Sequence, residues 1–158
     1  SNGVASFSRG IAFSQTNSSA TGATATGTTL SHFETGTWTP VVEGGTSAGT
    51  YTSVFSSATY TRIGNIVTLN YTLAFNSHTG TGRLEITNLP FAIGTNAAAI
   101  GGVQANSGLS WSAGHSPVAA GYGSIIIFQA TDRTGGQYED IQIAAEILYL
   151  RGTLTYFV

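Results

Sequence analysis

Three segments between residues 36 and 91 decide the fold: Gly36-Thr37-Trp38-Thr39-Pro40, Tyr60-Thr61-Arg62-Ile63-Gly64-Asn65-Ile66-Val67, and Thr79-Gly80-Thr81-Gly82-Arg83-Leu84-Glu85-Ile86-Thr87-Asn88-Leu89-Pro90-Phe91. Each is rich in residues that favour β-strands and is bounded by Gly, Asn or Pro. These bounding residues favour turns, and proline cannot donate a hydrogen bond to a sheet. The stretch therefore predicts a core of short antiparallel strands.

The strongest strand signal runs from residue 67 to residue 75. Apolar residues alternate there with polar or small ones, and the apolar positions are Val67, Leu69, Tyr71, Leu73 and Phe75. A period of two over nine residues predicts a strand with one buried face and one polar face. The dipeptide Gly64-Asn65 just before it predicts a tight turn.

Further strands are expected outward from this segment, at residues 38–42, 83–87, 124–130 and 147–158. We count eight or nine short strands and no convincing amphipathic helix, although residues 138–146 are compatible with one helical turn. This pattern predicts an all-β fold, an antiparallel β-sandwich of jelly-roll type, over residues 36–158.

Residues 1–35 have a different composition and are predicted to form an extended arm or linker. Residues 14–31 are nearly all Ser, Thr, Ala, Gly, Asn and Gln, which cannot bury enough apolar surface to fold alone. Two interpretations stay open. The segment is a flexible tail, or its apolar residues Val4, Phe7, Ile11 and Phe13 dock on a neighbouring subunit.

The composition excludes several classes of function. Only 8% of the 158 residues are charged, the net charge is −2, and all five basic residues are Arg. Nucleic-acid binding, which needs clustered basic residues, is therefore not expected. The absence of Cys excludes disulfides and zinc-thiolate sites, and no apolar run is long enough to span a bilayer. Low charge suits a permanent assembly, although ordinary neutral domains share it. The chain also lacks Met, so we expect a fragment or a cleaved product.

Catalytic patterns are missing, so we expect no enzyme activity, no cofactor and no metal site. The seven acidic residues are scattered, which disfavours the paired carboxylates of glycoside hydrolysis. His32, His78 and His115 lie far apart in the sequence. Gly80-Thr81-Gly82 lacks the Lys of a phosphate loop and is interpreted as a turn.

One group of residues predicts a sugar site. Trp111 stands among small polar residues, and His115 and Tyr122 follow it. These rings could stack on a sugar while Asp132 and Arg133 bind its hydroxyls. The alternative is that Trp111 fills a gap beneath its loop or at a subunit contact. Trp38 is interpreted as a structural anchor.

The chain also resembles a known family. Gly-Thr-Trp-Thr-Pro, a Tyr-x-Arg-Ile-Gly-Asn element and Leu-Pro-Phe occur in this order in the C-terminal domains of many bacteriophage tail fibres, tailspikes and related virion surface proteins. The matching positions here are Gly36, Trp38, Pro40, Tyr60, Arg62, Gly64, Asn65, Leu89 and Pro90.

The resemblance implies a homotrimeric β-sandwich on the surface of a phage particle, in contact with other virion proteins. Its implied roles are trimerisation and attachment to a host receptor, most often a glycan. The family's depolymerase activity normally belongs to a β-helix that this chain lacks. Two alternatives remain open: a capsid-decorating or head-fibre protein, and a non-catalytic carbohydrate-binding module.

Overall fold

A computed structural model describes residues 11–12, 29–30, 32–95, 99–107, 109–110, 118–131, 138–143 and 148–158. The described residues form strands and turns only, which confirms the all-β prediction. The strands are β1 (Ile11–Ala12), β2 (Thr29–Leu30), β3 (Phe33–Thr37), β4 (Val41–Gly44), β5 (Tyr51–Ile63), β6 (Ile66–His78), β7 (Leu84–Thr87), β8 (Ala99–Ser107), β9 (Leu109–Ser110), β10 (Val118–Tyr122), β11 (Ile125–Thr131), β12 (Tyr138–Asp140), β13 (Gln142–Ile143) and β14 (Leu148–Phe157).

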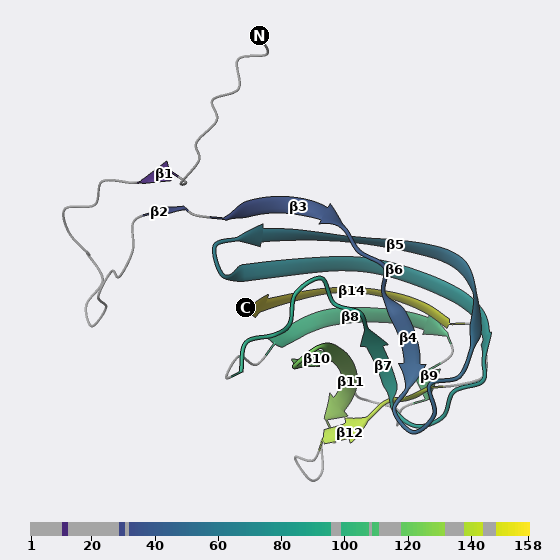
Figure 1. Cartoon of the computed structure of the whole chain (residues 1–158). Helices are drawn as coiled ribbons and strands as arrows, with labels where there is room; N and C mark the ends of the chain where they lie inside the picture. The colour runs from purple at the N-terminus through teal and green to yellow at the C-terminus, as the bar shows by residue number, and fades with distance from the viewer. Residues whose placement is uncertain are drawn as a thin grey trace.

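Ten of these strands form one antiparallel sheet. Its order is β3-β5-β6-β14-β8-β10-β11-β7-β4, and β12 pairs with β11. The sheet curls into a half-barrel, so that β7 and β4 come round to face the long central strands (Figure 1). The two further pairs, β1 with β2 and β9 with β13, are short. Because ten of the described strands join edge to edge in one curled sheet, the predicted two-sheet sandwich is not confirmed.

The core lies inside the curl. Val67, Leu69, Tyr71, Leu73 and Phe75 on β6 are all buried, which confirms the predicted alternation. The far side of the core comes from the shorter strands β7 and β11, and includes Leu84, Ile86, Ile126 and Phe128. Alternation places each strand's other side chains on the outer face of the half-barrel.

The hairpin between β5 and β6 is the longest paired unit, with a register that runs from Ile63↔Ile66 to Tyr51↔His78. Its two-residue turn consists of Gly64 and Asn65. Gly64 has a φ of 60°, whereas Asn65 keeps a negative φ. Positive φ at only the first central residue is the pattern of a type II′ turn, which matches the twist of the flanking strands.

Two other predictions are tested by the described strands. The helical turn with which residues 138–146 are compatible is not formed at residues 138–143, because Tyr138–Asp140 pairs with β11 and Gln142–Ile143 pairs with β9. Residues 144–146 lie outside the described residues. The strand predicted from Trp38 to Val42 is divided, since β3 ends at Thr37 and β4 begins at Val41. β3 also runs across the predicted boundary between residues 35 and 36. The described residues contain no helix that could span a membrane.

Candidate binding face of the sheet

Part of the sequence motif gathers at one corner of the half-barrel. Gly36 on β3 leaves room for the ring of Tyr60, because a Cβ at Gly36 would lie 2.7 Å from that ring. The Tyr60 ring meets Phe91 edge to face at 5.5 Å. Arg62 lies over the Phe91 ring at 4.7 Å, and its Nε donates to the Gly64 carbonyl at 2.9 Å. Desolvation, followed by the nearby Glu34 carboxylate, raises the pKa of Tyr60.

The remaining motif positions also have structural surroundings. Pro40 is buried, and Trp38 and Leu89 pack against the core. The indole N–H of Trp38 is buried without a partner among the described residues, while its backbone N–H donates to Ala58. Asn65 accepts a backbone hydrogen bond from Val158 at 2.9 Å, and Pro90 is half-buried. The motif therefore marks contacts within the domain.

The outer face of the sheet carries a row of exposed apolar side chains at one end. Phe33, Ile63, Ile66 and Phe157 lie directly opposite one another across β3, β5, β6 and β14. Paired residues project from the same face, so the four side chains form one continuous strip, which we call the apolar row. Their exposed fractions are between 41% and 67%. A single partner surface could cover all four side chains at once, and contiguous exposed apolar patches of this kind often mark interaction sites.

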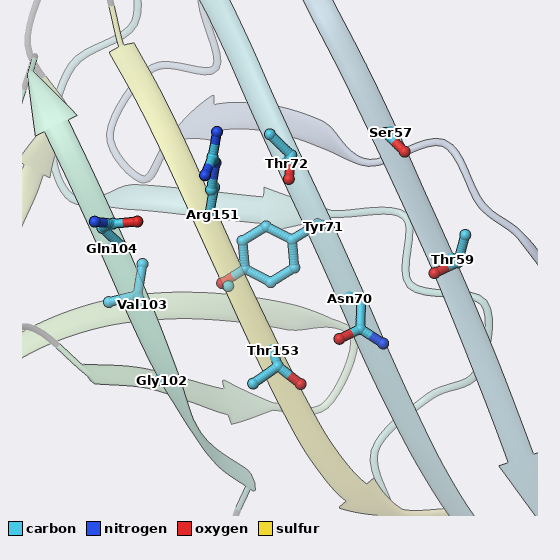
Figure 2. A pocket seen from close by; sticks show the side chains of 11 residues that line it. Ser57, Thr59, Asn70, Tyr71, Thr72, Gly102, Val103, Gln104, Arg151 and Thr153 are labelled. Atoms are coloured by element: carbon cyan, nitrogen blue, oxygen red, sulfur yellow. The ribbon is translucent and has the colours of Figure 1, made fainter.

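Farther along the same face, small polar side chains surround a shallow depression of about 450 Å³. Figure 2 shows it spreading over β8, β14, β6 and β5. We call it the polar depression. It is lined by Ser57, Thr59, Asn70, Tyr71, Thr72, Gly102, Val103, Gln104, Arg151, Gly152 and Thr153.

Charge is almost absent from this face. Among the described residues that face outward on β3, β5, β6, β14 and β8, Arg151 is the single charged side chain. It lies in a cross-strand line with Ser57, Thr72 and Gln104. The Arg151 guanidinium lies over the ring of Tyr149, with its carbon 4.8 Å from the ring centroid. Its Nε donates to the Tyr149 hydroxyl at 2.8 Å, and Nη2 donates to the same oxygen.

The sugar site predicted around Trp111 lies mostly outside the described residues. Trp111, His115, Asp132 and Arg133 all belong to segments of which the structure describes nothing. Tyr122 ends β10, is 57% exposed and does not line the polar depression. That site therefore stays a prediction.

The buried histidine has a structural role. His78 accepts a hydrogen bond at Nδ1 from the Gly80 backbone N–H at 2.8 Å, so its proton resides on Nε2, which donates to the Val42 carbonyl at 3.1 Å. The ring also stacks on Tyr51 at 5.4 Å. Both ring nitrogens are occupied by the protein itself, and no cluster of three potential metal ligands occurs within the described part of the chain.

Comparison with known proteins shows a similarity of fold. No protein-family model and no curated protein matches the sequence. The crystal structure of the Dettilon tailspike protein (gp208) superposes with a TM-score of 0.61 and 22% sequence identity. The match covers 80% of this chain and 24% of the tailspike chain. About four fifths of this chain thus shares its fold with about a quarter of that tailspike chain.

Proposed function

We propose that the chain is a structural domain of a phage tail spike or fibre, where it forms a homotrimer and attaches the particle to a host glycan without catalysis. The observation that carries this proposal is the apolar row on a nearly uncharged face. The tailspike fold and the sequence motif support the location on a phage particle.

Other copies of the same chain are the proposed occupants of the apolar row. An apolar strip costs free energy while it faces water, and a face with one charged residue can approach another copy with little repulsion. Permanent subunit contacts are typically more apolar than transient ones. The row also begins at Phe33, so a neighbour that covers it would lie beside the C-terminal end of the proposed arm, residues 1–35.

The experiment is the solution mass of the purified chain, measured by light scattering over a range of dilutions. We expect three times the chain mass of 16.2 kDa. Replacing Ile63 and Ile66 by Thr keeps β-branched side chains on the strands, and it should convert the trimer to folded monomers. Val54→Thr is the control, because Val54 is 61% exposed but lies outside the row.

A folded monomer at all concentrations would contradict the trimer. If deletion of residues 1–31 leaves the solution mass and the thermal stability unchanged, the arm has no role in assembly. The proposed role of the apolar row would still stand. Loss of the trimer with Val54→Thr as well would show that the effect is not specific to the row.

A carbohydrate-binding module is the second candidate, and the polar depression favours it. A shallow site of neutral hydrogen-bonding side chains suits a sugar whether or not the domain belongs to a virion. Specific adsorption to host cells by the purified trimer would support the phage function. Sugar binding by a monomer without adsorption would favour the module.

A further inference from the structure

We propose that the polar depression binds an acidic sugar, with the carboxylate of a uronic-acid type residue on Arg151. This inference rests on the proposed glycan attachment and names the chemical class of the sugar. It starts from one cation that stands among neutral hydrogen-bonding groups (Figure 2).

The charge of Arg151 is not neutralised within the described part of the chain. The ion pairs found there both involve Arg83, which contacts Glu85 at 2.6 Å and Asp140 at 3.8 Å. No described carboxylate lies within ion-pair distance of Arg151. An arginine with no described carboxylate partner, in the lining of a polar hollow, can attract an anionic ligand.

The guanidinium is already held in position. Its Nε and Nη2 both donate to the Tyr149 hydroxyl, and its central carbon lies over the Tyr149 ring, 4.8 Å from the ring centroid. The hydrogens of Nη1 and one hydrogen of Nη2 remain for a ligand. A carboxylate can accept two parallel hydrogen bonds from that end of the fork, and the fixed side chain loses little entropy when it does so.

The surrounding side chains match sugar hydroxyls. Gln104 and Thr72 flank Arg151 in the same cross-strand line, and Asn70 and Thr153 lie in the neighbouring line. Amides and hydroxyls both donate and accept, as sugar hydroxyls do. The volume of about 450 Å³ falls within the range of small-molecule sites. A single arginine also balances a monoanionic carboxylate better than a doubly charged phosphate.

Among the described residues that line the depression, the single aromatic ring is that of Tyr71, and it is buried. The Tyr71 ring packs under Gly152 on the core side, where its hydroxyl is buried. Without an exposed ring to stack on, a neutral sugar gains only exchangeable hydrogen bonds, each of which has a small net value in water. Charge should therefore decide which sugars bind.

The test uses the full chain and three probes: D-glucuronate, D-glucose and acetate. Binding is followed by NMR chemical-shift titration of the backbone amides of β6, β8 and β14. We expect glucuronate to saturate in the millimolar range, with glucose and acetate each about tenfold weaker or more. Arg151→Gln should weaken glucuronate binding about tenfold. Arg83→Gln, which removes an equal charge elsewhere, should leave it unchanged.

Several results would overturn the proposal. Equal affinity for glucose and glucuronate would make the depression a neutral-sugar site, and equal affinity for acetate would make it a simple anion site. Equal losses with Arg151→Gln and Arg83→Gln, or no saturable shifts up to about 100 mM glucuronate, would refute it outright.

The proposed function is tested separately by mass and by adsorption to host cells. If Arg151→Gln stays trimeric and adsorbs normally, the acidic-sugar inference fails while the attachment function stands. If the unmodified chain is monomeric and does not adsorb, the attachment function fails whatever the sugars show.

Discussion

At the scale of single residues, Gly152 shows how a missing side chain lets the sheet bury a large one. Gly152 pairs with Tyr71 across β14 and β6, and both face the core. A Cβ at position 152 would collide with the hydroxyl end of the Tyr71 ring. The tyrosine thus occupies space that any other residue at position 152 would fill.

Gly152→Ala should lower the free energy of unfolding by about 1–3 kcal/mol, because the added methyl overpacks the core against Tyr71. Gly102→Ala is the matched control, since a Cβ at Gly102 meets nothing within 4 Å. It should be neutral or stabilising by up to about 1 kcal/mol, because alanine restricts the unfolded chain. Urea denaturation of the two variants provides the measurement.

Truncating the ring provides a check on the mechanism. In the Tyr71→Leu background, Gly152→Ala should cost clearly less than in the native chain, since the collision is relieved. An equal cost in both backgrounds would mean that backbone conformation, and not the Tyr71 ring, sets the preference for glycine.

At the scale of elements, the β5–β6 hairpin is tied to the following loop by Arg62. The side chain closes its own turn through the Gly64 carbonyl and lies over the Phe91 ring, which in turn meets Tyr60. A hairpin alone is marginally stable in water. The corner therefore couples the turn to residues beyond β7.

Arg62→Lys keeps the charge but loses the planar guanidinium, so it should lower the free energy of unfolding by about 1 kcal/mol. A double-mutant cycle with Phe91→Leu should give a coupling of about 0.5–1 kcal/mol. Arg151→Lys serves as the control and should cost less than about 0.5 kcal/mol, since that side chain is exposed. Additive effects at positions 62 and 91 would contradict the corner contact.

The elements differ in how far the sequence could predict them. β6 was predictable because it packs one face on the core, and that burial imposes a strict alternation. β12 and β13 were not, because they are only three and two residues long and are defined by their pairing with β11 and β9. The apolar row was not predictable from the sequence for a similar reason. Phe33 and Phe157 are far in sequence from Ile63 and Ile66, and only the sheet register brings Phe33 opposite Ile63 and Phe157 opposite Ile66.

At the scale of the whole molecule, the candidate site follows from topology. Arg151 could be assigned to a polar strand face from the sequence, but nothing there indicated that Gln104 and Thr72 lie beside it. The sheet order β6-β14-β8 creates that neighbourhood. Composition did indicate the general character of the surface, since a chain with 8% charged residues has few ionic groups to place on any face.

The buried tyrosines make the stability of the whole half-barrel sensitive to alkaline pH. Burial raises the pKa of Tyr156 from 10.0 to about 12, and it also raises the pKa of Tyr71. A phenol whose pKa is raised by folding contributes stability that is complete below the unfolded pKa of 10 and is lost as the pH rises through the folded pKa. Tyr156 alone should cost about 2 kcal/mol between pH 10 and pH 12.

We therefore expect cooperative unfolding in that interval, with tyrosinate absorbance and far-ultraviolet circular dichroism changing together. Tyr71→Phe removes one titrating group, together with a buried hydroxyl that has no described partner, so it should move the midpoint to higher pH. Tyr122→Phe changes an exposed residue and should leave the midpoint where it is. The contrary outcome is that the circular dichroism signal of the strands persists above about pH 12 while all tyrosines ionise. Water would then reach the Tyr71 and Tyr156 hydroxyls without unfolding, and the core would be looser than its burial indicates.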